Sequence, residues 1–185
     1  MKTAVAHLKS VSPYSQSKYI SAKKPRDQTH ADFEQEHWRE RMHVDSSGIV
    51  FIPPMAFKNC LSEAAKYKSI QIPGKGKSTY TKHFEAGVLC FSPLSLGIKA
   101  KDVAAEVLHV PADGRRNGTK RVEKTFPLIP SWEGHVEFLV ADEIIDEEVF
   151  RLHLEDAGKF IGIGRFRPRN NGYYGRFEVL GIKWS

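Results

Sequence analysis

The chain has little cysteine: Cys60 and Cys90 are the only two among its 185 residues, and they form no CxxC pair. A disulfide framework and a cysteine-based zinc or redox site are therefore not expected, and a reducing compartment suits the protein. The sequence also lacks an apolar run near the length of a membrane-spanning helix, about 20 residues. Its first residues are too polar for a signal peptide. We therefore expect a cytoplasmic protein that does not enter a membrane.

Several enzyme motifs are missing as well. The sequence contains no Walker loop and no GxSxG nucleophile elbow. Residues 83–85 (HFE) match half of a zinc deaminase signature, but the PCxxC half is absent. His30, His37 and His43 do not have the spacing of four residues that a helical zinc pair needs. We therefore predict no metal and no cofactor, and we assign no catalytic residue.

Positive charge, in contrast, is in excess. Lysine and arginine together number 28 against 22 acidic residues, which gives a formal net charge of +6. The sequence pI is about 9.3. The hydrophobic content of 41% is ordinary for a globular protein, and the length fits one domain over residues 1–185. The charge favours an anionic partner.

The positive charge is most concentrated between Gly162 and Phe177. This segment contains four glycines, four arginines and two tyrosines, but no acidic residue. Guanidinium groups bind phosphates, tyrosine rings stack on bases, and glycines let the backbone approach a ligand closely. In an extended segment, alternating arginines would also point to the same side. The predicted nucleic-acid-binding residues here are Arg165, Arg167, Arg169, Tyr173, Tyr174 and Arg176; the alternative is a solvated turn.

Two further stretches, residues 71–82 and 113–124, are basic and contain glycine. We interpret them as loops that become ordered on a ligand. The alternative for such charge runs is a solvated surface without a ligand. The candidate binding residues in these stretches are Lys75, Lys77, Tyr80, Lys82, Arg115, Arg116, Lys120 and Arg121.

The hydrophobic pattern predicts a mixture of strands and helices. Strands are expected at residues 3–8, 48–53, 108–111, 135–140 and 176–184, and within 84–98. Helices are expected after Pro53-Pro54 and after Asp146, where an apolar stripe follows a start signal; 32–43 is a helix or an irregular strand, and 99–107 a short helix. The expected order is strand, strand, helix, an inserted, thumb-like subregion at about 68–124, strand, helix, glycine-rich loop and strand, which without the insertion is close to β-α-β-β-α-β. This order predicts a ferredoxin-like (RRM-like) α+β fold, with an antiparallel sheet, helices on one face and a basic insertion after the first helix.

Two segments of this pattern resemble the RAMP superfamily, whose members are subunits of CRISPR effector complexes. Residues 51–67 (FIPPMAFKNCLSEAAKY) are similar to its strand–helix junction at Ile52-Pro53, Ala56, Lys58 and Leu61. Residues 161–177 (IGIGRFRPRNNGYYGRF) are similar to its glycine-rich loop before the last strand. The usual serines before the lysine and the arginine after it are absent. The resemblance covers about half the chain and adds Lys58 to the candidate binding residues.

These observations predict a protein that binds single-stranded RNA or DNA without strong sequence preference. The resemblance implies side-by-side assembly along the strand, as a homo-oligomer or within a larger ribonucleoprotein complex, and a phage or mobile-element relative fits the same pattern. One alternative is a metal-independent endoribonuclease of the RAMP type that uses His7, His30 or His43. Another is an interaction or assembly protein that docks an acidic partner.

Overall fold

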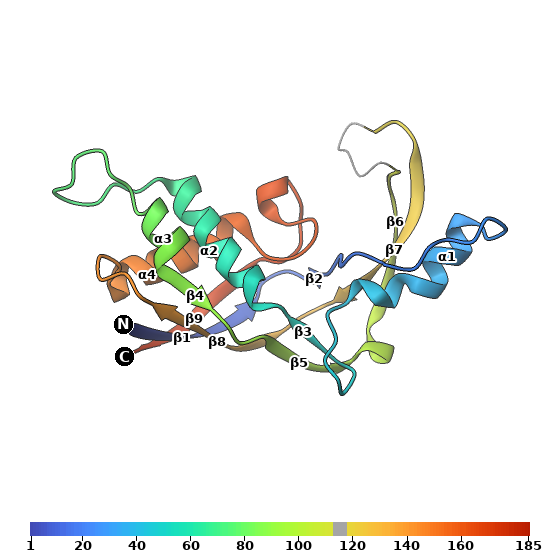
Figure 1. The fold of residues 1–185 in the computed structure, drawn as a ribbon, viewed down its shortest axis with the longest axis horizontal. Coiled ribbons are helices and arrows are strands. Elements are labelled where there is room, and N and C mark those ends of the chain that lie inside the picture. Colours follow the sequence, from blue (N-terminus) through green and yellow to red (C-terminus); the bar gives the residue numbers. More distant parts are fainter. Residues whose placement is uncertain (113–117) are drawn as a thin grey trace.

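The centre of the molecule is a four-stranded antiparallel sheet with the strand order β4–β8–β1–β9 (Figure 1). The computed structural model describes residues 1–112 and 118–185. The strands of this sheet are β1 (Lys2–Ser10), β4 (Val88–Cys90), β8 (Glu133–Val140) and β9 (Phe177–Trp184). Strand β1 lies in the middle, where Ala6 is opposite both Val136 and Ile182. The first and last strands along the chain are therefore neighbours in the sheet.

Helices cover one face of this main sheet (Figure 1). They are α2 (Pro54–Lys68), α3 (Thr81–Gly87) and α4 (Glu147–Asp156), which continues into a π-helical turn (Ala157–Ile161). Taken in chain order, β1, α2, β4, β8, α4 and β9 form β-α-β-β-α-β. The predicted fold class, a ferredoxin-like α+β fold with an antiparallel sheet and helices on one face, is confirmed.

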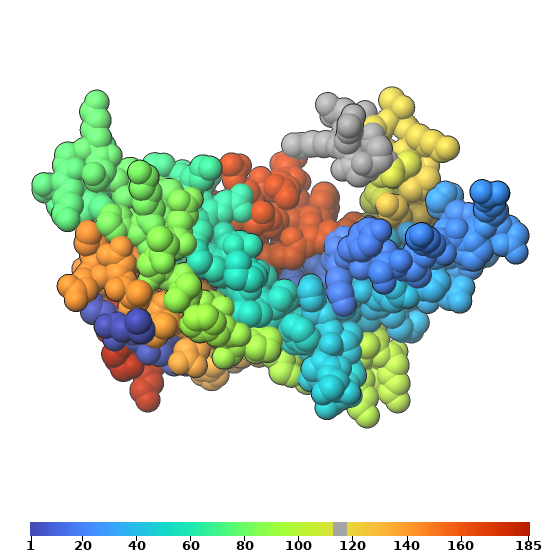
Figure 2. All heavy atoms as spheres, viewed as in Figure 1, coloured from blue at the N-terminus to red at the C-terminus, as the bar shows by residue number. Residues whose placement is uncertain are grey.

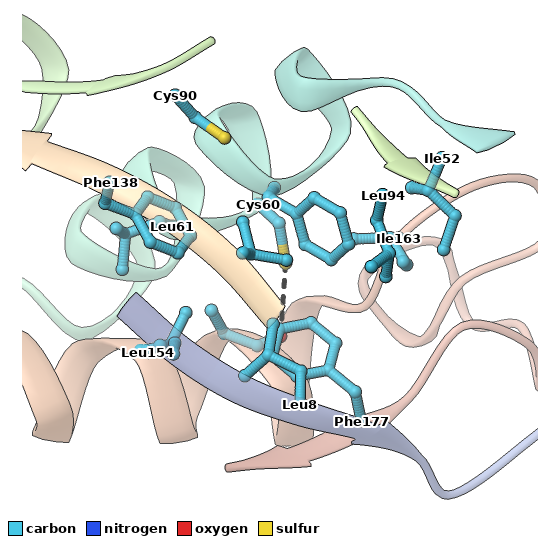
Figure 3. Packing of buried hydrophobic residues seen from close by; sticks show 14 of the residues in the cluster. Leu8, Ile52, Cys60, Leu61, Cys90, Leu94, Phe138, Leu154, Ile163 and Phe177 are labelled. Carbon is cyan, nitrogen blue, oxygen red and sulfur yellow. Dashed lines mark hydrogen bonds between the residues drawn. The ribbon is translucent and has the colours of Figure 1, made fainter. Parts of the chain in front are cut away.

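The core lies between the main sheet and α2 and α4. Strand β1 contributes its alternate side chains Ala4, Ala6 and Leu8, all fully buried. The predicted apolar stripe of α2 is buried at Phe57, Cys60, Leu61 and Ala64. Figure 3 shows Cys60, Leu61, Phe138 and Leu154 in this layer, together with the hydrogen bond from the Cys60 thiol to the Ala157 carbonyl (3.3 Å). Each large apolar side chain buried here stabilises the fold by about 1.5–3 kcal/mol.

The predicted helix starts are confirmed. Helix α2 begins at Pro54, directly after Pro53. Asp146 caps α4, because its side-chain oxygen accepts a hydrogen bond from the Val149 amide at 2.8 Å. Glu147 and Glu148 follow in the first turn, where negative charge interacts favourably with the helix dipole.

Two smaller sheets extend the fold at one end (Figure 1). One has the order β2–β7–β6, from β2 (Tyr14–Ser15), β7 (Arg121–Ile129) and β6 (Ala104–Pro111); the other pairs β3 (Ile49–Ile52) with β5 (Leu94–Lys99). Helix α1 (His30–His37) and a 3-10 turn (Trp38–Arg41) lie against β7. Two more 3-10 turns occur at Ala100–Asp102 and Pro168–Asn170. Strands β6 and β7 form a long hairpin that projects from the body of the molecule.

Some local predictions are wrong. The short helix expected at 99–107 is only the 3-10 turn at Ala100–Asp102, because the residues after it pair with β7 along the hairpin. Residues 84–87, expected in a strand, complete α3. In both cases tertiary contacts outweigh local propensity. For residues 32–43, the helical interpretation is confirmed up to the 3-10 turn.

The residues predicted as one insertion, about 68–124, are divided in the structure. They include β4, which belongs to the main sheet, as well as β5 and β6, which do not. The chain leaves the ferredoxin-like core twice, between β1 and α2 and again between β4 and β8. Within residues 1–112 and 118–185, none of the helices combines the length and apolar character needed to cross a membrane.

Candidate nucleic-acid interface

The segment between the π-helical turn and β9, residues 162–176, is hereafter the glycine–arginine loop. It is folded back on itself, because the Ile163 amide donates to the Gly175 carbonyl and the Tyr174 amide donates to the Phe166 carbonyl, both at 3.0 Å. It is also tied to the N-terminal part of the chain: the Arg165 amide donates to the Ser15 carbonyl at 2.9 Å. These backbone bonds hold the loop in one place before any ligand binds.

Glycine is required at several points of this loop. Gly175 has φ +78°, and a Cβ there would lie 1.9 Å from the carbonyl oxygen of Ile163. Gly164 has φ +75°, and a Cβ would lie 2.5 Å from the carbonyl oxygen of Ser15. At both positions the left-handed backbone and the close approach of a carbonyl oxygen exclude other residues. The glycines predicted to bring the backbone near a ligand therefore also bring it near the rest of the protein.

The arginines of the loop do not point the same way, because the segment is not extended. The Arg165 guanidinium stacks on the Phe126 ring of the β6–β7 hairpin, 3.5 Å from its centroid. Arg167 and Arg169 turn instead toward α2, where both contact the Glu63 carboxylate at 2.8 and 3.3 Å. The loop thus bridges α2 and the hairpin.

Arg165 is half-buried. Burial lowers the pKa of its guanidinium, while the neighbouring Glu106 carboxylate and Tyr174 act in the opposite direction. Among the described residues its Nη1 has no hydrogen-bond partner, although the atom is buried. A buried guanidinium N–H without an acceptor costs free energy.

Only one of the three predicted stacking tyrosines is exposed. Tyr173 presents 59% of its surface to solvent. Tyr174 is buried and its hydroxyl donates to the Glu106 carboxylate; burial, together with this bond, raises its pKa to about 12. Tyr80 is buried against the ring of His153. We therefore keep Tyr173 as a base-stacking candidate and leave out Tyr174 and Tyr80.

Lys58 is also engaged within the protein. Its ammonium donates to the Ser62 hydroxyl (2.6 Å) and to the carbonyls of Phe84 (3.1 Å) and Glu85 (2.8 Å). The two carbonyls belong to the last turns of α3, so Lys58 caps the C-terminus of that helix. All three N–H donors are used, and we leave Lys58 out of the interface.

The other basic candidates lie at the surface. Lys75 and Lys77 in the α2–α3 connection, Lys82 in α3, and Lys120 and Arg121 at the β6–β7 hairpin are exposed, and Arg176 is half-buried. Arg115 and Arg116 lie outside the described residues. In Figure 1 the α2–α3 connection, the glycine–arginine loop and the hairpin all project on the side where α2 lies. Figure 2 shows the loop (orange-red) at the surface between α2 and the hairpin.

A cavity of about 440 Å³ opens beside the loop and is hereafter the loop cavity. Its wall includes Lys18 from the N-terminal segment, His43, and Arg165, Phe166 and Asn170 of the loop. Lys18, Phe166 and Asn170 are not among the predicted binding residues. The aromatic residue between two arginines in RFR was the available signal for Phe166, whereas Lys18 is brought near only by the fold.

The candidate histidines are separated by the fold. His7 lies on the open face of the main sheet, stacked on His135 with ring centroids 4.5 Å apart. His30 starts α1, at the far end of the molecule. His43 alone of the three lines the loop cavity. Burial, then the Lys18 charge, lowers its pKa. No group of three or more His, Cys, Asp or Glu side chains in the described parts of the chain is placed to hold a metal ion.

Comparison with solved structures gives relatives of the fold at low sequence identity. Cmr6 from Pyrococcus furiosus shares 13% identity and a TM-score of 0.50, over 97% of this chain and 99% of that one. A chain of the Type III-B Cmr-beta complex bound to cognate target RNA gives 12% identity and 0.47, over 99% of this chain and 60% of that chain. A chain of a CRISPR RNA-guided surveillance complex shares 8% identity with a TM-score of 0.44, over 98% of this chain and 68% of that chain. No protein-family model and no curated protein matches the sequence.

Proposed function

We propose that the protein binds single-stranded nucleic acid, RNA or DNA, along the side that carries the glycine–arginine loop. The observation that carries the proposal is the position of this loop. It is anchored by backbone bonds, and it lies between exposed lysines of the α2–α3 connection and basic residues of the β6–β7 hairpin. The fold shared with Cmr6 and the motif resemblance to the RAMP superfamily support the same proposal.

Binding proceeds by charge neutralisation and stacking. Lys75, Lys77 and Arg121 contact phosphates and release counterions, which makes affinity depend steeply on salt. The exposed ring of Tyr173 stacks on a base, which requires no particular sequence. Arg167 and Arg169 exchange the Glu63 carboxylate for phosphate oxygens at little geometric cost, because both are already aimed at an anionic group.

We propose further that copies of the chain assemble side by side along the strand, within a homo-oligomer or a larger ribonucleoprotein complex. One loop contacts only a few nucleotides, so a longer bound strand requires neighbouring subunits. The resemblance to CRISPR backbone subunits supports this arrangement. The complex would then grow in steps as the strand lengthens.

The experiment is a binding series with labelled single-stranded RNA and DNA of several lengths, across salt concentrations and with EDTA present. We expect intact strands, affinity that rises with length, and a steep salt dependence. The variant Arg169→Gln/Tyr173→Ala should bind more weakly than wild type, whereas Lys9→Gln/Lys183→Gln on the open sheet face should not. Salt-insensitive binding, or none, would refute the proposal.

A denaturing gel of the same samples tests the endoribonuclease alternative. His43 is the histidine beside the loop cavity. If the protein cleaves RNA in EDTA and His43→Ala abolishes the cleavage, the function is catalysis and not binding alone. A complex with an acidic protein that survives nuclease treatment would support the interaction protein instead.

A further inference from the structure

The loop cavity differs in charge from other cavities of the molecule. Its described wall contains two cationic side chains, Lys18 and Arg165, and no carboxylate. Four other surface cavities each include at least one aspartate or glutamate in the wall. A volume of about 440 Å³ lies within the range of small-molecule sites. The cavity is thus suited to an anionic ligand of moderate size.

The start of α2 adds to this positive potential. Pro53 and Ala56, at the first turn of this 15-residue helix, line the cavity. Among the described residues no side chain caps the helix, and its first turn contains no acidic residue. The positive end of the helix dipole therefore acts in the same direction as Lys18 and Arg165.

Phe166 supplies an apolar surface at the same cavity. The residue is 50% exposed, and its backbone has φ +51°, a conformation that a bulky residue rarely adopts. The Tyr174 amide holds the Phe166 carbonyl at 3.0 Å, and the two rings contact edge to face at 5.9 Å. A strained backbone that presents an exposed aromatic ring beside a cationic cavity suggests a functional constraint.

Asn170 completes the set of groups that a nucleotide needs. Its side-chain amide offers both donors and an acceptor, and it lies in the wall with Phe166. The cavity therefore combines cations for a phosphate, a ring for stacking and an amide for a base edge. We propose that the loop cavity holds a single nucleotide of the bound strand, with its phosphate at Lys18 and Arg165 and its base on Phe166. This inference rests on the proposed function and names the unit of the strand that the site receives.

The first test uses a mononucleotide as the probe. Uridine 5′-monophosphate is titrated into the ¹⁵N-labelled protein, and amide shifts are followed. We expect saturable shifts at residues 14–18, at His43 and at 164–170, and much weaker shifts with uridine, which lacks the phosphate. Shifts that map to another part of the chain, or equal shifts with uridine, would overturn the assignment.

The second test uses strand binding by variants with matched controls. Phe166→Ala should weaken binding of a single-stranded oligonucleotide about 5- to 150-fold, the range for removal of one base–aromatic stack. Phe91→Ala removes a ring that is 69% exposed elsewhere and should leave affinity unchanged. Lys18→Gln should lower the slope of log affinity against log salt by about one, and Lys183→Gln should not.

The two tests separate the inference from the function on which it rests. If single-stranded oligonucleotides bind wild type and both variants equally, and the mononucleotide causes no amide shifts at the loop cavity, the assignment of the nucleotide site is wrong. The proposed binding of single strands then stands. If the mononucleotide binds at the cavity but no strand binds, the proposed function is wrong and the nucleotide site stands. If neither binds, both are refuted.

Discussion

The two sides of the main sheet carry different chemistry. The helix side carries the glycine–arginine loop, with arginines against α2 and the β6–β7 hairpin. The open face alternates charges of both signs along β8, β1 and β9: Lys9 faces Glu133 and Glu178, and Val5 lies between Glu137 and Lys183. Lysines on the open face are offset by carboxylates, whereas the loop segment has no acidic residue of its own. The sequence-wide excess of charge is therefore less informative than where the fold places it.

The two sides of the main sheet also differ in their tolerance of amino-acid substitution. Gly164 and Gly175 of the loop have a carbonyl oxygen close to where a Cβ would be, whereas Gly181 on β9 has no atom within 4 Å of that position. Substitutions should therefore have unequal effects on the two sides. The largest expected difference concerns folding, and the smallest concerns binding.

Gly175→Ala should destabilise the protein by about 3 kcal/mol, because it adds a Cβ at a positive φ and against the Ile163 carbonyl. Gly181→Ala should change the free energy of unfolding by less than about 0.5 kcal/mol. Urea unfolding followed by circular dichroism measures both. Equal effects would mean that the loop relaxes freely and does not have the anchored geometry described above.

Arg167→Gln/Arg169→Gln should weaken binding of a single strand about tenfold or more, since charge-assisted hydrogen bonds contribute about 1.5–3 kcal/mol each. The salt slope should fall by about one for each phosphate that the variant no longer neutralises. Lys9→Gln/Lys183→Gln removes the same charge from the open face and serves as the control. An equally weakened control would show that net charge alone drives binding.

Tyr174→Phe should alter the alkaline limb of the stability profile. The pKa of Tyr174 is raised to about 12 from the usual value of 10, so the folded protein keeps a proton that the unfolded chain releases. The contribution of Tyr174 to the free energy of unfolding is complete below pH 10. It falls by roughly 1 kcal/mol, after allowance for solvent screening, as the pH rises toward 12. Tyr174→Phe should reduce this loss. An alkaline limb of Tyr174→Phe identical to that of wild type would contradict the prediction.

Glu63→Gln should strengthen strand binding about two- to fivefold at low salt. It removes a carboxylate that competes with phosphate for Arg167 and Arg169, and exposed ion pairs of this kind contribute about 0.2–1 kcal/mol. Glu137→Gln on the open face is the matched control. If Glu63→Gln weakened binding instead, the carboxylate would serve to position the arginines.

Most elements of the ferredoxin-like order could be predicted because their signals are local. Pro53-Pro54, the stripe from Phe57 to Ala64 and the Asp146 cap each determine structure within a few residues. Strand β4 has only three residues and no distinctive pattern, so its place in the main sheet was hidden within the predicted insertion.

Prediction of the site was less complete. Residue type indicated the glycine–arginine loop, but only the fold shows that Lys58 caps α3 and that Tyr174 binds Glu106. Both roles depend on partners at least 26 residues away along the chain. For the same reason, Lys18 could not be associated with the loop: the contact between the N-terminal segment and Gly164 exists only in the folded chain.

The reactivity of Cys60 reports on local opening of the native structure. Its thiol is fully buried beneath the turn that leads into the glycine–arginine loop, and burial raises its pKa, so a thiol reagent at neutral pH reacts only when this junction opens. The rate at which the reagent labels Cys60 therefore reports the free energy of local opening, and no engineered cysteine is needed. A strand that binds across the loop and α2 would slow this rate, and ligand-dependent protection could be recorded by mass spectrometry on the wild-type chain.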